Sequence, residues 1–224
     1  MSINLENYTA IKEELHGKAT LVAVSKTKPA EDIQALYDLG QRDFGENYVQ
    51  ELAEKEAVLP KDIHWHFIGH LQSNKVKYIA PFVHLIHGVD SFNLLKEINK
   101  QALKNNRMID CLLQVHIAKE ETKFGLDEKE LNELVQMLAK SELNNIRVTG
   151  LMGMASFSDD TELVSNEFRQ LKNIFEQHAQ YSTFNFQLST LSMGMSGDYK
   201  IALEEGSNMV RIGSLLFGER NYPQ

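Results

Sequence analysis

The chain has 224 residues, of which 42% are hydrophobic and 24% are charged, as in an ordinary soluble globular protein. Its formal net charge is -8, and no basic tail or arginine-rich run offsets it, which argues against nucleic acid as the main partner. Cys111 is the single cysteine, so no intrachain disulfide can form and a reducing cytoplasm fits. No apolar run approaches the length of a membrane span and no signal-peptide pattern opens the chain, so we expect no membrane partner.

Hydrophobic periodicity predicts eight β-strands that alternate with α-helices. The strands are expected at 20–25, 42–44, 64–68, 83–89, 109–117, 146–152, 184–189 and 208–213. Helices are expected at 4–16, 29–39, 47–58, 91–104, 127–140 and 160–180, with shorter ones that end near 80, 206 and 217. Pro29 suits a first helical turn and Gly40 follows the end of that helix, which supports these two boundaries.

The alternation is typical of βα units around a parallel sheet, so the predicted fold class is α/β. Eight units favour a closed (β/α)8 TIM barrel, in which the site lies at the carboxyl ends of the strands. The alternative is an open doubly wound sheet, but residues 24–30 lack the G-x-G-x-x-G turn that is typical of dinucleotide-binding folds. We find no linker or low-complexity segment, and we therefore expect a single domain over residues 1–224.

Lys26 stands where the first buried strand should end, because Pro29 cannot continue a β-ladder. A lysine in this position is costly to desolvate, and a desolvated amine has a lowered pKa and can form a Schiff base with a carbonyl compound. The alternative is that the side chain simply extends from the strand end into solvent. The residues that follow the other strands bear on this choice.

Chemically distinctive residues follow most of the predicted strands, and a barrel would bring them to one rim. They are Lys26, Glu46, Asn47, His70, Gln72, Asn74, Lys75, Lys123, Met152, Gly153, Met154, Ser192, Ser196, Arg211, Gly213 and Ser214. The amino ends of the strands are expected to carry plainer residues, such as Thr20, Gln41 and Asn145. This asymmetry favours a role for Lys26 in a site at the carboxyl-end rim.

The stretch 209–214, MVRIGS, predicts an anion site beside that lysine. Gly213 permits a ligand to approach the backbone, whose successive N–H groups can hold an anion. TIM barrels commonly bind phosphate at the loops after strands seven and eight, and residues 191–198, LSMGMSGD, supply hydroxyl groups and a helix start. Two plainer interpretations stay open: an ordinary helix cap within 191–198, and a salt-bridged Arg211 at the barrel end.

The histidines form no metal-binding pattern in the sequence. His64 and His66 alternate around Trp65, and one of them should face the core and be hydrogen-bonded. No H-x-x-x-H motif or carboxylate grouping at ligand spacing is present, so we predict no metal site. No G-x-S-x-G motif appears, and Cys111 is expected to be a small buried hydrophobic residue, so hydrolase chemistry is unsupported.

Six motifs occur in the order that they have in a known family. They are AVSKTKP at 23–29, FGENYVQE at 44–51, WHFIGHLQSNK at 65–75, GLMGM at 150–154, LSMGMSGD at 191–198 and MVRIGSLLFGER at 209–220. With them the chain resembles the YggS/PROSC family of pyridoxal 5′-phosphate (PLP) homeostasis proteins over nearly its whole length. The resemblance implies a single barrel similar to the N-terminal domain of bacterial alanine racemase, without that enzyme's C-terminal β domain.

The resemblance also implies roles for five cofactor-binding residues. Lys26 would carry PLP as an internal aldimine, and Arg211 would face the pyridine nitrogen. Gly213 and Ser214 match backbone donors to the phosphate, and Ser192 matches a hydroxyl donor to it.

Other positions are less closely defined by the resemblance. Asn47 matches a position near the cofactor, and Lys123 matches a lysine of the family's site region. His70 departs from the family pattern, since many members carry proline or another small-loop residue there. The residues whose roles stay open are Lys28, Lys75, Lys77, Lys123 and His70.

The function implied by the resemblance is to bind PLP as a Schiff base on Lys26, to buffer it in the cell and to pass it to PLP-dependent apoenzymes. PLP drives carbanion chemistry best when a carboxylate keeps its ring nitrogen protonated, and Arg211 cannot accept a proton. The racemase also uses a tyrosine base supplied by its other domain, and we find no replacement for it. We therefore expect a carrier rather than a catalyst. We also expect the protein to be cytoplasmic and monomeric.

Three alternatives stay open. The first is a slow PLP-dependent amino-acid racemase, which would interconvert D- and L-alanine. The second is a (β/α)8 enzyme that uses Lys26 as an aldolase-type Schiff-base former on a phosphorylated metabolite, and borohydride trapping with and without PLP would identify it. The third is a purely structural role with no bound small molecule.

Overall fold

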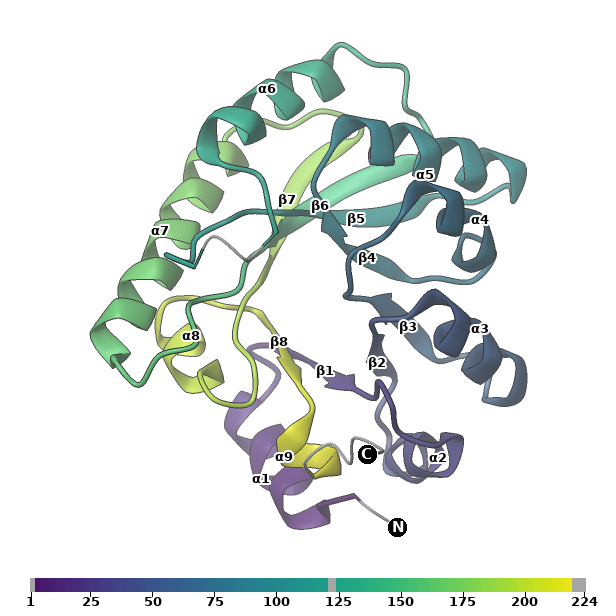
Figure 1. Ribbon diagram of the computed structural model, residues 1–224, viewed down its shortest axis with the longest axis vertical. Coiled ribbons are helices and arrows are strands. Elements are labelled where there is room, and N and C mark those ends of the chain that lie inside the picture. Colours follow the sequence, from purple (N-terminus) through teal and green to yellow (C-terminus); the bar gives the residue numbers. More distant parts are fainter. Residues whose placement is uncertain (1–2, 121–123, 219–224) are drawn as a thin grey trace.

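The computed structural model describes residues 3–120 and 124–218, which contain a closed barrel of eight parallel strands (Figure 1). The strands are β1 (Thr20–Val24), β2 (Asp43–Glu46), β3 (His64–Phe67), β4 (Leu85–Val89), β5 (Ile109–Gln114), β6 (Ile146–Met152), β7 (Phe186–Ser192) and β8 (Met209–Ile212). Each strand pairs with the next one along the chain, and β8 closes the barrel on β1. The predicted (β/α)8 barrel is confirmed.

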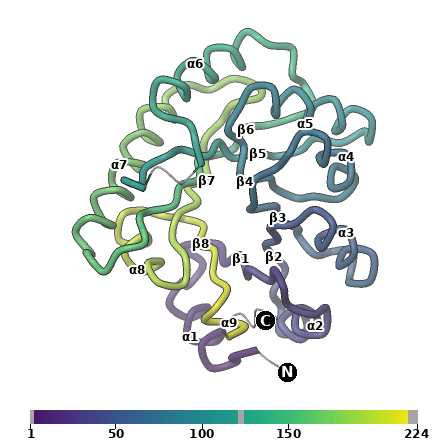
Figure 2. Tube along the Cα trace, viewed as in Figure 1, coloured from purple at the N-terminus to yellow at the C-terminus, as the bar shows by residue number. Residues whose placement is uncertain are grey.

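Helices surround the strands in chain order, as the trace in Figure 2 shows. They are α1 (Leu5–Leu15), α2 (Ala30–Asp38), α3 (Val49–Val58), α4 (Val76–Ile79), α5 (Phe92–Lys104), α6 (Glu128–Ala139), α7 (Thr161–Ala179), α8 (Tyr199–Glu204) and α9 (Ser214–Phe217), with a 3-10 turn at Ser73–Lys75. The carboxylates of Asp127 and Asp160 accept backbone N–H groups at the starts of α6 and α7, as N-cap residues do. Over the described ranges, no helix is both long and apolar enough to cross a membrane.

Two strands depart furthest from their predicted limits, and most of the others differ by one or two residues. The fifth ends at Gln114 instead of residue 117, and the seventh runs from Phe186 to Ser192 instead of over 184–189. Phe184 is exposed in a turn that Thr183 and Phe186 close with backbone hydrogen bonds, so the strand begins after it. The polar stretch that follows pairs with β6, where Gly150 lies opposite Thr190. The hydrophobic pattern does not predict this extension of the strand, because Thr190 and Ser192, which pair with β6 there, are polar.

Apolar side chains pack in two layers. The larger cluster includes Trp65 and Ile86 and lies between the strands and the helices. The smaller cluster consists of Val22, Leu85, Leu112, Met152 and Met209. Because successive strand residues point to opposite faces, this second cluster lies inside the barrel together with the buried side chains of His66 and His87. The barrel interior therefore holds polar groups as well as apolar ones.

Candidate functional site

A cavity of about 490 Å³ opens at the carboxyl-end rim of the barrel. Its volume falls within the roughly 300–1,000 Å³ that is typical of small-molecule sites. The rim residues predicted from the sequence that line this cavity are Lys26, Asn47, Met154, Ser196, Arg211, Gly213 and Ser214. The loop between β6 and α7 adds Ser156, Phe157, Ser158 and Asp159 to the wall. The fold thus brings an amine, a guanidinium group and several hydroxyls to one opening.

The turn that carries Lys26 is anchored by a buried network between β1, β2 and α3. Ser25 is fully buried, and its hydroxyl donates to Glu46 Oε1 at 2.6 Å. Lys55 Nζ donates to the carbonyl oxygen of Ser25 at 2.8 Å, to Glu46 Oε1 at 2.7 Å and to Glu51 Oε1 at 2.7 Å. A buried ammonium group with three acceptors is satisfied in a dry environment. The strand end before Lys26 is therefore fixed to its neighbours.

Thr27, directly after Lys26, has a left-handed backbone with φ of 64°. That region is rare for a β-branched residue and costs about 1–2 kcal/mol. The N–H of Thr27 donates to Glu51 Oε1 at 2.6 Å, the same oxygen that accepts from Lys55. Strain of this kind persists where neighbouring groups impose it, and it gathers at functional sites. Sequence reasoning missed this feature, because threonine gives no signal for a left-handed turn.

Glu46 is the titratable group at the centre of this network. Burial raises the pKa of Glu46 to about 7, although the charge of Lys55 opposes the rise. Its second oxygen, Oε2, is buried and has no hydrogen-bond partner among the described residues. A carboxyl that is partly protonated near neutral pH can place its hydrogen on such an oxygen. The support beneath Lys26 is therefore sensitive to pH.

Asn47 follows β2 and lines the cavity. Its side-chain oxygen Oδ1 is buried and finds no hydrogen-bond partner within residues 3–120 and 124–218. Buried polar atoms are seldom unpaired, so an unpaired one on a cavity wall indicates that a ligand completes it. The close approach of Gly69 keeps this residue in place, since a Cβ at Gly69 would lie 2.4 Å from the carbonyl oxygen of Asn47. Glycine is therefore required in the loop after β3.

Arg211 of β8 is buried, and three oxygen atoms direct its guanidinium group. Nη1 donates to the carbonyl oxygen of Ser192 at 2.9 Å and to Ser192 Oγ at 2.7 Å, and Nη2 donates to the carbonyl oxygen of Gly153 at 3.0 Å. Burial lowers the pKa of Arg211 to about 10, which leaves the group charged at neutral pH. These partners are neutral oxygens rather than a carboxylate. The geometry therefore presents a positive group of fixed orientation to the cavity.

The structure places Ser192 within the seventh strand, beside Arg211. It is the last residue of β7 rather than a loop residue, and it is fully buried. Its hydroxyl accepts from Arg211 and lies 3.4 Å from Nδ1 of His87. The cavity wall contains Ser196 and Ser214 instead. The structure thus ties Ser192 to Arg211, and a contact between Ser192 and a phosphate stays a prediction.

A line of polar side chains crosses the barrel interior from Ser192 to the opposite rim. His87 Nε2 lies 2.9 Å from His66 Nδ1, and His66 Nε2 lies 3.0 Å from Asp43 Oδ1. Because a carboxylate only accepts, the consistent assignment puts a proton on Nε2 of each imidazole. Burial lowers the pKa of both histidines, which keeps them neutral at pH 7. The expectation that one of the two histidines flanking Trp65 is buried and hydrogen-bonded is confirmed by His66.

The remaining basic residues of interest lie in different places. Lys28 lines the cavity, and its Nζ donates to the carbonyl oxygen of Phe217 at 2.7 Å. Lys75 and Lys77 are exposed on the short helical segment after β3, beside the ring of Tyr78. Lys123 lies outside the described residues.

His70 follows β3 but is not part of the cavity wall. Its Nδ1 lies 3.6 Å from Asp90 Oδ2, and its ring stacks on that of Phe124 with 5.0 Å between the centroids. Half of the His70 side chain is exposed. The structure thus places His70 in a surface contact between the loops after β3, β4 and β5.

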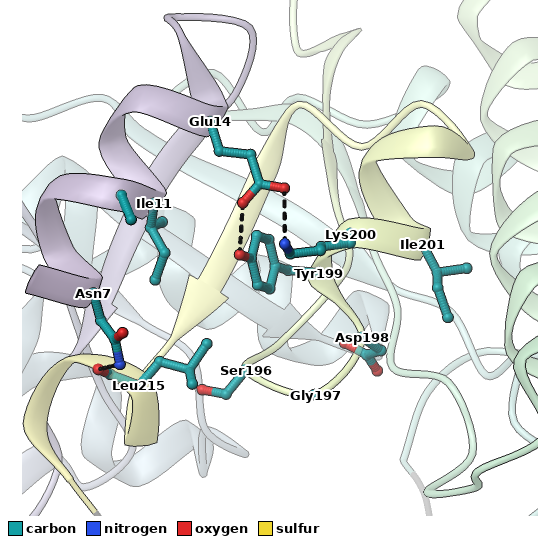
Figure 3. A pocket seen from close by; sticks show the side chains of 11 residues that line it. Asn7, Ile11, Glu14, Ser196, Gly197, Asp198, Tyr199, Lys200, Ile201 and Leu215 are labelled. Atoms are coloured by element: carbon teal, nitrogen blue, oxygen red, sulfur yellow. Dashed lines mark hydrogen bonds and ion pairs between the residues drawn. The ribbon is translucent and has the colours of Figure 1, made fainter.

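A second cavity, of about 420 Å³, lies between α1 and the start of α8 (Figure 3). Glu14 accepts from the hydroxyl of Tyr199 at 2.8 Å and forms an ion pair with Lys200 at 3.4 Å. Burial and the hydrogen bond to Glu14 raise the pKa of Tyr199 to about 12. Residues 196–198 line both cavities, so this loop separates the rim site from the outer helices. The side chains of Glu14, Tyr199 and Lys200 in the second cavity are therefore paired with one another.

Comparison with known proteins agrees with this geometry. The family model "Alanine racemase, N-terminal domain" matches residues 5–221. The pyridoxal phosphate homeostasis protein of Aquifex aeolicus is 45% identical over 205 residues, which cover 91% of this chain and 88% of that protein. The protein of the same name from Escherichia coli K12 is 39% identical over 207 residues, covering 91% and 86%. The chain belongs to the family of pyridoxal phosphate homeostasis proteins.

Solved structures support the same family. PipY of Synechococcus elongatus PCC7942, whose structure contains bound PLP, is 34% identical, with a TM-score of 0.86 over 95% of this chain and 99% of PipY. Alanine racemase from Bartonella henselae is 20% identical, with a TM-score of 0.72 over 99% of this chain and 65% of the racemase. At that identity the racemase shows a shared fold. The predicted similarity to its N-terminal barrel is confirmed.

The amino-end rim of the barrel is not plain, and that prediction is wrong. Asp43 and His64 are the first residues of β2 and β3, His66 lies two residues further along β3, and His84 directly precedes β4. Burial acts to raise the pKa of Asp43, but the hydrogen bond from His66 and the nearby histidines lower it overall. Burial lowers the pKa of His84 to about 4. The sequence shows these residues far apart, and only the pairing of three strands brings them together.

Proposed function

We propose that this protein binds pyridoxal 5′-phosphate in the rim cavity through a covalent bond to Lys26, and that it holds and releases the cofactor rather than using it for catalysis. The observation that carries the proposal is that Lys26, Asn47 and Arg211 line one cavity, and that Asn47 has a buried side-chain oxygen without a partner among the described residues. The relatives' names and the PLP in the PipY structure give it independent support.

The residues present fit this cofactor. An amine can condense with the aldehyde with loss of water, and Lys26 supplies one at the opening. Gly213 and Ser214 offer backbone and hydroxyl groups where the family binds phosphate, and the Gly213 N–H at present donates to Ser196 Oγ at 3.2 Å. Asn47 Oδ1 gains a partner when a ligand fills the cavity. These roles for Lys26, Asn47, Gly213, Ser214 and Arg211 are part of the proposal.

Arg211 supports a carrier rather than an enzyme. PLP supplies an electron sink for carbanion chemistry, which is strongest when an acidic partner keeps the ring nitrogen protonated. A guanidinium group only donates, so Arg211 leaves a nitrogen opposite it unprotonated. No tyrosine lines the cavity within the described part of the chain, so a second acid–base group of that kind is not found. If the purified protein interconverts D- and L-alanine faster than free PLP does, the racemase alternative replaces this proposal.

The proposal extends to the partners of the protein, its oligomeric state and its location in the cell. We expect transfer of the cofactor to PLP-dependent apoenzymes, a monomeric state and a single domain. We also propose a cytoplasmic location, since Cys111 is a free thiol and a chain with a single cysteine uses no internal disulfide.

The test is the absorption spectrum of the purified protein with added PLP. Wild type should show a band of protein-bound cofactor, and borohydride reduction should fix the cofactor to the peptide that contains Lys26. Lys26→Ala should lose both signals. Lys28→Met is the matched control, because Lys28 lines the same cavity, and it should keep them. A Lys26→Ala protein with an unchanged band would remove the assignment.

A further inference from the structure

Four polar side chains meet at the amino-end rim, outside the cavity of the proposed function. Asp43 Oδ1 lies 3.0 Å from His66 Nε2 and 3.3 Å from His64 Nδ1. The ring of His84 stacks on that of His64 with 4.5 Å between centroids and lies 5.4 Å from that of His66. Asp43 Oδ1 therefore pairs with both His66 and His64. His84 adds a third imidazole, which contacts the other two through its ring.

The ligand atoms of Asp43, His66 and His84 all lie within 4.8 Å of one another. Tetrahedral zinc sites hold imidazole nitrogen and carboxylate oxygen about 2.0–2.2 Å from the metal, so ligand atoms on one ion lie a little over 3 Å apart. The pair Asp43 and His66 already has that spacing, and His84 needs a small movement. His84 is exposed at the strand entrance, where such a movement meets little resistance.

We propose that Asp43, His66 and His84 form a site for a divalent transition-metal ion of the zinc class, with a fourth position open beside His64. Two imidazoles and one carboxylate suit this class of ion, whereas magnesium and calcium prefer oxygen ligands alone. The ion can reach the site because His64 is about half exposed and Asp43 is 25% exposed. This proposal does not depend on the binding of PLP.

A partner that can orient His66 on the ion is already present in the structure. A metal-bound histidine commonly donates its other ring N–H to a fixed partner. His66 would bind the ion through Nε2, and its Nδ1 lies 2.9 Å from His87 Nε2 inside the barrel. His87 Nδ1 in turn lies 3.4 Å from Ser192 Oγ. An ion bound to His66 Nε2 would leave the proton of each imidazole on Nδ1, so that His66 donates to His87 and His87 donates to Ser192 Oγ. Arg211 still donates to Ser192 Oγ, since a guanidinium group cannot accept.

No metal site is predicted from the sequence, because its histidines and carboxylates do not occur at the short spacings typical of metal ligands. Asp43, His66 and His84 are about 20 residues apart, each on or beside a different strand. The three strands are neighbours in the sheet, with Asp43 opposite His64 and His66 opposite Leu85. The grouping arises from this register and is invisible in local motifs.

The experiment is a titration of the metal-free full chain with Co²⁺ and Zn²⁺, without PLP, followed by visible absorption and calorimetry. We expect one Co²⁺ per chain with the absorption of nitrogen and oxygen coordination, displaced by Zn²⁺. Asp43→Asn and His84→Ala should each weaken binding by roughly 100-fold or more, since loss of a ligand exceeds the 10–100-fold effect of second-shell changes.

His16→Asn is the matched control, because His16 is an exposed histidine whose left-handed backbone, with φ of 44°, asparagine tolerates. It should leave Co²⁺ binding unchanged. Circular dichroism of each variant checks the fold. His84→Ala is expected to disturb folding less than Asp43→Asn, because His84 is exposed. Wild type that takes up no Co²⁺ or Zn²⁺ overturns the proposal. Uptake that Asp43→Asn and His84→Ala leave intact overturns it equally, because the ion then binds to other groups.

Discussion

At the carboxyl-end rim, side chains from strand ends and loops surround a cavity, and several are held by charged groups buried beneath them. At the amino-end rim, the polar side chains come from the starts of three adjacent strands and contact one another directly. Lys26 depends on Lys55, Glu46 and Glu51 for the shape of its turn. His66 is placed by the register of β3 against β2 and is held by its contacts with Asp43 and His87. One rim is therefore built to receive a molecule, while the other is compact enough to hold only an ion.

The interior line of His66, His87 and Ser192 joins these two rims. It ends at Arg211, which lines the rim cavity. The link between Ser192 and His87, at 3.4 Å, is longer than the usual hydroxyl hydrogen bond and is its weakest step. The comparison of the two rims thus leads to four tests, from the largest expected effect to the smallest.

Removal of the charge beneath Lys26 should have the largest effect on stability. Lys55→Met leaves Glu46 buried without its cation, and breaking a buried pair in this way costs about 3–5 kcal/mol. Lys61→Met is the control, because Lys61 pairs with Glu56 at the surface, where such pairs contribute roughly 0–1 kcal/mol. Urea unfolding of both variants measures the difference. Equal losses would mean that the network does not anchor the turn.

Ser192→Ala should separate the two roles considered for this residue. Loss of a hydrogen bond to a charged group costs about 1.5–3 kcal/mol of stability, and the freed guanidinium should weaken binding of PLP and of pyridoxal alike. Pyridoxal lacks the phosphate, so a phosphate contact would weaken PLP binding alone. Ser214→Ala, at the cavity wall, is the comparison that should show this second pattern. Titrations with both ligands decide between the roles.

The pH dependence of stability should report Glu46. Its pKa in the fold, about 7, lies above the ordinary value of 4.5, so the folded chain binds more protons between these pH values than the unfolded chain. This contribution is fully present below pH 4.5 and is lost as pH rises through 7. Glu46→Gln removes it, so its unfolding free energy relative to wild type should rise over that window. A constant difference between the two proteins would place the titration elsewhere.

Thr27→Asn should have the smallest effect and the opposite sign. Asparagine tolerates the left-handed backbone better than a β-branched residue, so the variant should gain up to about 1 kcal/mol of stability. Thr20→Asn, in β1, is the control and should show no gain, because asparagine is disfavoured in strands. Thermal unfolding of both variants gives the comparison. A loss in Thr27→Asn would show that the threonine side chain has another contact of value.

The sequence by itself determined the barrel and most of the residues at its carboxyl-end rim. Eight apolar strands alternate with amphipathic helices, and closure of such a sheet sends Lys26, Asn47 and Arg211 to one end whatever the details of packing. The period of the hydrophobic residues is visible in short stretches of sequence, and the alternation of strands and helices that it predicts implies the topology.

Tertiary structure alone decided how the polar groups are paired. The partner of Ser192 is Arg211 on the next strand, Glu46 titrates near neutral pH because of its burial, and the amino-end histidines meet because β2, β3 and β4 align in one register. Such contacts join residues about 20 positions apart or more. Their energies depend on distance and on exclusion of water, and neither quantity is written in a run of neighbouring residues.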